Sequence, residues 1–84
     1  MIVKVIEVKT MFASEDVQYY LEDEKHNIYY WITKSVKAWD ELYRAKIKNI
    51  EVQITSFKLA EKWICPKYEE KVQTIKNVRF RLLG

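Results

Sequence analysis

The chain has 84 residues, with 15 Lys and Arg against 12 Asp and Glu, a net charge of +3 and a pI near 9.0. This length allows one domain, 1–84, and excludes dinucleotide-binding folds, α/β barrels and two-domain clefts. One Cys cannot form an internal disulfide, and one His with one Cys cannot complete a tetrahedral zinc site. No apolar run reaches the roughly 18–20 residues of a membrane span, and no signal-peptide pattern opens the chain. We expect a soluble, cytoplasmic protein without a cofactor.

The charge is unevenly distributed along the chain. Residues 1–33 carry three Lys and six acidic residues, a net charge of −3, whereas residues 34–84 carry twelve basic and six acidic residues, a net charge of +6. This asymmetry favours an anionic partner for the second half. An ordinary charged surface is the alternative interpretation.

Period-two alternation predicts three strands in the first part of the chain. Residues 2–10 and 17–22 are rich in β-branched and aromatic side chains, and every residue of 28–33 belongs to these two types. The polar turn 23–27 joins the second and third of these strands in a predicted hairpin.

A change of period then predicts a short helix over 34–44, where Val36, Trp39 and Tyr43 fall at helical spacing beside Leu42. A strand beginning near Glu41 is the competing interpretation. Residues 45–57 are expected to form a strand with a bulge near Asn49, residues 58–70 mainly a loop, and residues 71–83 the last strand.

Five strands with a helical connector between the third and fourth are typical of the OB-fold, a small Greek-key barrel. We therefore expect an all-β, five-stranded OB-like barrel. Another small barrel, or an α+β sandwich with the same number of strands, is the alternative.

Two segments resemble one group of such domains. Residues 23–33, DEKHNIYYWIT, are similar to a D-E-x-G-N-x-[aromatic]-x-W-x-T hairpin, and residues 67–79, KYEEKVQTIKNVR, to an x-Y-x-x-x-x-Q-T-x-x-x-x-[KR] stretch. Both patterns occur in small OB-fold domains of phage and mobile-element replication proteins, associated with helicases and primases. Together the segments cover under a third of the chain. The resemblance implies single-stranded DNA binding in replication, or a structural subunit of a replication complex.

The chain departs from this family pattern at three places. His26 stands where the hairpin turn has Gly, and Glu69 and Glu70 follow Tyr68 where Gly is frequent. The usual Gly of the fourth strand is absent, and Asn49 is its candidate substitute. Acidic residues beside Tyr68 suit a phosphate backbone poorly, so the departures weaken the transfer of function more than that of the fold.

Bases would need aromatic side chains on which to stack, and we expect these on the second and third strands. In 28–33 the face that carries Ile28, Tyr30 and Ile32 is the better core candidate, which places Tyr29 and Trp31 outward together with Tyr20. The alternative is a reversed register with Trp31 in the core.

A basic rim would bind the phosphates. The candidates are Lys58, Trp63, Lys67, Tyr68, Lys71, Arg79 and Arg81, in which cations and aromatic residues are interleaved. Alternatively, Trp63 plugs the barrel, and the two arginines protect an edge strand.

The remaining candidates have simpler interpretations. Trp39, Leu42 and Tyr43 are expected in the core, with a partner interface as the alternative. His26 is expected on a surface turn, and Cys65 as a structural or exposed thiol. Glu22, Asp23 and Glu24 lack a complementary base or metal ligand in sequence, so we expect no enzyme.

Two functions follow from these residues. The first is a module that binds single-stranded DNA, or RNA, through the aromatic and basic residues. The second is a protein-interaction subunit that docks on a polymerase, primase or helicase, or on a second copy of the chain.

Overall fold

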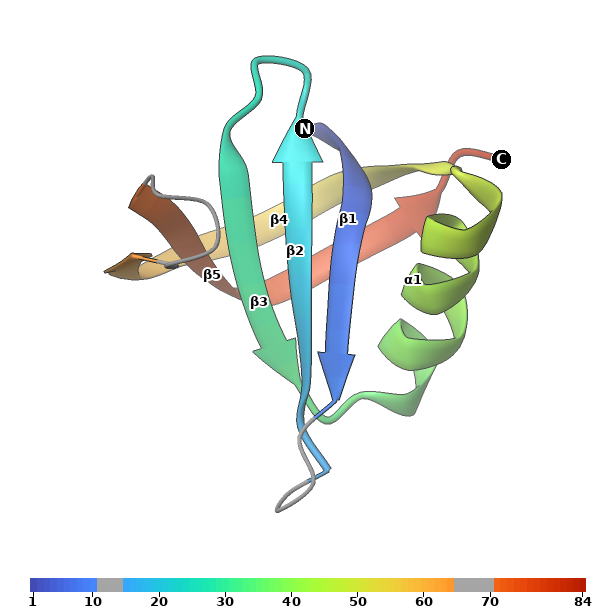
Figure 1. Cartoon of the computed structure of the whole chain (residues 1–84), viewed down its shortest axis with the longest axis horizontal. Coiled ribbons are helices and arrows are strands. Elements are labelled where there is room, and N and C mark those ends of the chain that lie inside the picture. The colour runs from blue at the N-terminus through green and yellow to red at the C-terminus, as the bar shows by residue number, and fades with distance from the viewer. Residues whose placement is uncertain (11–14, 65–70) are drawn as a thin grey trace.

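The computed structural model describes residues 1–10, 15–64 and 71–84, apart from the side chains of 61–64 and 71. Its elements are β1 (Ile2–Thr10), β2 (Val17–Asp23), β3 (Ile28–Thr33), α1 (Val36–Lys48), β4 (Glu51–Ile64) and β5 (Lys71–Leu82) (Figure 1). The strands form a closed barrel in the order β1-β2-β3-β5-β4, with α1 between β3 and β4 in the chain. The expected five-stranded OB-like barrel is confirmed.

Two features close the barrel. β1 is antiparallel to both β2 and β4, so it joins the two halves of the sheet. On the other side β3 runs parallel to β5, with Tyr29 opposite Gln73 and Tyr30 opposite Thr74. Because closure leaves no free edge between these strands, the inward residues form one enclosed core.

The core fills the barrel and extends beneath α1. Its buried members are Val3, Val5, Tyr19, Leu21, Trp31, Ala38, Leu42, Ala45, Val52, Ile54 and Ile75. Three of these, Ala38, Leu42 and Ala45, are the buried residues of α1. A bulge in β1 between Val5 and Glu7 breaks the alternation, and Ile6 packs instead against a second cluster outside the barrel.

The helix is longer than predicted. It begins after Ser35, whose hydroxyl accepts a hydrogen bond from the Ala38 backbone N at 3.2 Å, and it continues to Lys48. Asn49 ends it in the left-handed conformation, with φ of 55°. The expected strand over 45–48 and bulge at Asn49 were therefore wrong, because Ile47 follows the helical period.

The β4–β5 hairpin is also longer than predicted. β4 continues to Ile64, so the expected loop over 58–64 was wrong, and residues 65–70 lie outside the described part of the chain. Shifts of register between Ile54 and Ser56, Ser56 and Lys58, and Leu59 and Lys62 remove the regular period. No helix in the described residues is long and apolar enough to span a membrane.

Candidate nucleic-acid interface

The register of β2 and β3 decides which aromatic residues face outward. Tyr19 lies opposite Trp31 and Leu21 opposite Tyr29, and all four belong to the barrel core or pack against it. Trp31 is only 8% exposed, with its ring 6.0 Å from that of Phe80. The expectation that Tyr29 and Trp31 face outward was therefore wrong. Large apolar side chains occur on both faces of β3, so alternation alone could not identify the inner one.

The outer face of these strands carries a second cluster. It consists of Tyr20, Ile28 and Val72, with Ile6 and Tyr30 packed against it. Tyr20 faces outward as predicted, but it is 1% exposed. Its ring lies 5.3 Å from that of Tyr30 and 5.9 Å from the Lys9 ammonium group. A base cannot stack on so buried a ring, so this face offers half-buried Tyr30 and exposed Ile32 instead.

Among the side chains that the structure describes, the outer face of the β4–β5 ladder carries four exposed cations, which we call the basic face: Lys58, Lys76, Arg79 and Arg81. Lys58 lies directly opposite Lys76, Arg79 opposite Ser56 and Arg81 opposite Gln53. No Asp or Glu occurs in 52–60 or 72–82. Like charges placed opposite one another destabilise a sheet, so an anionic ligand would offset this repulsion.

Arg79 also lines a hollow between β3, the start of α1 and the second half of β5. The hollow is lined by Trp31, Ser35, Lys37, Val78, Arg79 and Phe80. Its wall thus combines two aromatic residues with one cation from α1 and one from β5. Of the residues predicted for binding, the structure brings Trp31 and Arg79 together here, and Lys37 is a further cation that sequence reasoning missed.

Four residues predicted for binding have side chains outside the described part of the chain. The backbone of Trp63 pairs with Val72 and that of Lys71 with Ile64, but their side chains lie outside the described part. Lys67 and Tyr68 lie wholly outside it.

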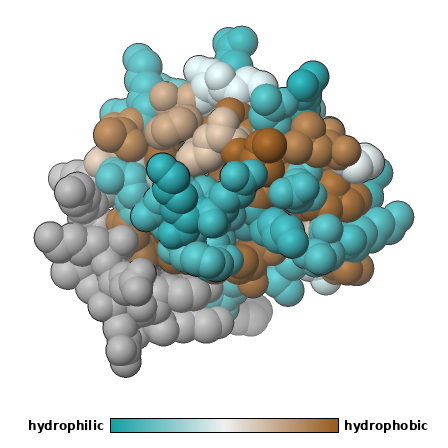
Figure 2. All heavy atoms as spheres, turned by 90° about the horizontal axis from the view of Figure 1, so that it is seen from above, coloured by the Kyte–Doolittle hydropathy of each residue, from teal (hydrophilic) through white to brown (hydrophobic). Residues whose placement is uncertain are grey.

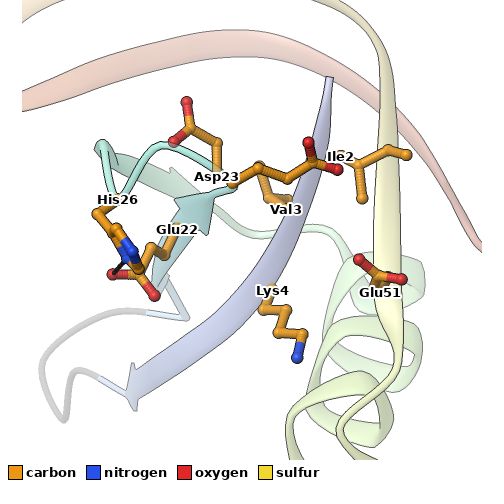
Figure 3. Close-up of a pocket in the computed structure, with 8 residues that line it drawn as sticks. Ile2, Val3, Lys4, Glu22, Asp23, His26 and Glu51 are labelled. Carbon is orange, nitrogen blue, oxygen red and sulfur yellow. Dashed lines mark hydrogen bonds and ion pairs between the residues drawn. The ribbon is translucent and has the colours of Figure 1, made fainter.

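The end of the barrel that carries the β2–β3 turn is acidic. Lys4 on β1 lies opposite Glu22 on β2 and opposite Glu51 on β4, with the two carboxylates to either side of it (Figure 3). A pocket of about 190 Å³ is lined there by these three residues together with Ile2, Val3, Asp23, Glu24 and His26. Hydrophilic residues fill the middle of the surface at this end (Figure 2). The described residues contain no group of three or more His, Cys, Asp or Glu able to hold a metal ion.

The turn at this end is organised by one carboxylate. Asp23 Oδ1 accepts hydrogen bonds from the backbone N of Lys25 and of Asn27, both at 2.9 Å, and Oδ2 accepts one from Asn27 Nδ2 at 3.0 Å. His26 has φ of 66°, a conformation that favours Gly. Its Nδ1 lies 3.4 Å from Glu22 Oε2.

Comparison of the chain with protein-family models, with curated proteins and with solved structures finds no match.

Proposed function

We propose that this protein is a non-enzymatic module that binds single-stranded nucleic acid, with the basic face as its phosphate contact. The observation that carries the proposal is the set of four cations on the outer face of β4 and β5, without an acidic residue in 52–60 or 72–82. Phosphate neutralisation provides most of the affinity in sequence-independent binding. The like-charge pair of Lys58 and Lys76 costs stability unless an anion lies across it.

The distribution of charge on the surface indicates a path for the bound nucleic-acid strand. Acidic Glu22, Glu24 and Glu51 repel phosphate from the turn end of the barrel. The nucleic-acid strand therefore runs from the basic face across the hollow that Lys37 and Arg79 line. The bases then stack on Tyr30, with Ile32 beside it, and not on Tyr29 and Trp31.

The setting in replication of a phage or mobile element rests on the resemblance of 23–33 and 67–79 to that group of domains. One backbone feature supports it: His26, at the position of the pattern's turn Gly, has the positive φ that Gly adopts readily. DNA is the ligand we propose, with RNA of the same length as the comparison.

Fluorescence anisotropy with a labelled oligothymidylate tests the proposal. We expect binding at low salt that weakens as salt rises, with a slope of log K against log salt of roughly −0.7 for each phosphate contact. Arg79→Gln should weaken binding and reduce the slope by about one contact. Lys25→Gln, at the acidic end, is the control and should change neither. Absence of binding at low salt, or equal loss in both variants, would contradict the proposal.

The alternative, a protein-interaction subunit, is favoured by a different observation. Val36 and Ile47, both apolar, are highly exposed on α1. Because these residues lie on the helix rather than on the basic face, the two functions are not exclusive.

A further inference from the structure

The helix α1 has two apolar faces, of which only one is buried. Ala38, Leu42 and Ala45 enter the core. The second face, which we call the outer stripe, consists of Val36, Trp39, Tyr43 and Ile47. At about 100° per residue these four fall within roughly 80° of arc, away from the buried side. A surface helix that packs only on its own domain is polar on the side facing water, so the outer stripe calls for a partner.

The outer stripe is open to solvent and internally ordered. Val36 is 72% exposed, Tyr43 42% and Ile47 64%. Trp39 is half-buried, and its ring stacks on that of Tyr43 with centroids 4.7 Å apart and planes 27° from parallel, so the two rings together form the centre of the stripe. Leu42 is in the core as predicted, but the expectation that Trp39 and Tyr43 are core residues was wrong.

The order of residues along the outer stripe is self-complementary. Val36 and Ile47 lie at its ends, with Trp39 and Tyr43 between them, and the midpoints of both pairs fall within one residue of each other. If a second helix lies antiparallel across the stripe on a two-fold axis near residues 41 and 42, each Val36 meets the partner's Ile47 and each Trp39 the partner's Tyr43. A two-fold interface of this kind uses one surface patch on both subunits.

The charges beside the outer stripe follow the same symmetry. Asp40 and Arg44 flank one edge of the stripe, four residues apart and centred on residue 42. The same two-fold axis therefore places each Asp40 beside the Arg44 of the other copy. A parallel two-fold arrangement would instead place these residues of the two copies on opposite edges of the interface, and the pairing of Asp40 with Arg44 would be lost. We propose that a second copy of this chain docks on the outer stripe, antiparallel and in this register.

The size of the stripe limits the strength of this dimer. Ile47 lies eleven residues after Val36, which corresponds to about 17 Å along the helix at 1.5 Å per residue. A single helix face of that length is smaller than the roughly 800 Å² per partner of a standard stable interface. The dimer is therefore a weak one, which forms at high protein concentration and dissociates on dilution. It goes beyond nucleic-acid binding and requires no nucleic acid.

Sedimentation velocity over a concentration series, from about ten micromolar to the millimolar range, tests the dimer. We expect a reversible shift from monomer to dimer. Tyr43→Lys, which places a charge in the centre of the stripe, should weaken association at least tenfold. Leu59→Lys, at an exposed apolar residue of β4, is the control and should leave association unchanged. Circular dichroism would establish that each variant is folded.

A charge-reversal pair tests the antiparallel register itself. Asp40→Arg alone and Arg44→Asp alone should each self-associate more weakly than the wild type, because each opposes like charges across the axis. An equimolar mixture of the two variants should regain association, since every crossing then joins opposite charges. A wild type that stays monomeric throughout, or a mixture no stronger than its separate components, would overturn the proposal.

Discussion

The hydroxyl of Tyr29 donates a hydrogen bond of 3.1 Å to Oδ2 of Asp23, joining the last residue of β2 to the second residue of β3. The same carboxylate accepts hydrogen bonds from the backbone N of Lys25 and from the backbone N and Nδ2 of Asn27, in the turn between β2 and β3. Asp23 therefore fixes the turn and holds Tyr29 at the mouth of the barrel. Since side chains alternate between faces, this also directs Trp31, two residues further on, into the core.

Protonation of Asp23 at low pH should weaken the hydrogen bonds that hold this turn. Burial acts to raise the pKa of Asp23, but the hydrogen bonds from Asn27, Tyr29 and Lys25 outweigh it, and the net pKa is below 3.8. A lowered folded-state pKa gives stability that is present above pH 3.8 and lost as the pH falls through the folded value. Asp23→Asn should therefore lower the melting temperature at pH 7 and flatten its fall between pH 4 and pH 2. Glu24→Gln is the control, and a fall as steep in Asp23→Asn as in the wild type would contradict the assignment.

Two tyrosine-to-phenylalanine variants should have opposite effects on stability. The Tyr19 hydroxyl is buried without a hydrogen-bond partner among the described residues, and such a group costs about 1–3 kcal/mol. Tyr19→Phe should raise the free energy of unfolding by up to that amount. Tyr29→Phe removes the bond to Asp23 and should lower it by about 0.5–1.5 kcal/mol. Urea denaturation measures both, and effects of the same sign would show that the Tyr19 hydroxyl has a partner.

Tyr19 should also limit stability at alkaline pH. Burial, and then the nearby charge of Asp40, raise the pKa of Tyr19 from 10.0 to about 12. A raised folded-state pKa gives stability that is complete below the unfolded value of 10 and is lost as the pH rises toward 12. Urea midpoints measured from pH 9 to pH 12 should therefore fall more steeply for the wild type than for Tyr19→Phe. Parallel curves would mean that Tyr19 ionises as readily in the folded protein as in the unfolded one.

The left-handed turn residue offers a stabilising substitution. His26 adopts φ of 66°, which costs a residue with a side chain about 1 kcal/mol relative to Gly. His26→Gly should therefore raise the melting temperature. His26→Ala, which loses the contact with Glu22 but keeps the side-chain carbon that causes the strain, should lower it or leave it unchanged. If both variants are destabilised, the contact with Glu22 outweighs the strain.

The five strands and the helix between β3 and β4 were predictable, because part or all of each strand alternates with period two and the period changes after β3. The sequence did not predict which face of β3 enters the barrel. Ile28 and Tyr30 on one face and Tyr29 and Trp31 on the other are all large and apolar, and this protein buries part of both. Alternation reveals orientation only where one face is polar.

The candidate site was predictable in part for a related reason. Arg79 and Arg81 alternate with Val78 and Phe80, which are half-buried against the core, so the outward placement of the two arginines followed from sequence. Lys76 was missed, because strict alternation would put it on the core side. Asn77, with φ of 54°, accompanies a change of face between Ile75 and Val78, which both contact the core. A change of this kind depends on tertiary pairing that one sequence does not reveal.

Charge reversal at Lys76 should change the stability of the protein and its affinity for nucleic acid in opposite directions. It lies opposite Lys58 on adjacent strands. An opposite-charge pair at such a position contributes about 0.2–1 kcal/mol relative to an Ala–Ala pair, whereas a like-charge pair is destabilising. Lys76→Glu should therefore raise the free energy of unfolding while it weakens binding of oligothymidylate. The double variant Lys58→Glu with Lys76→Glu restores like-charge repulsion, so its stability should return toward that of the wild type while binding falls further. Urea denaturation and anisotropy on the same preparations measure the two quantities. If Lys76→Glu weakens neither binding nor its salt dependence, the basic face does not contact phosphate.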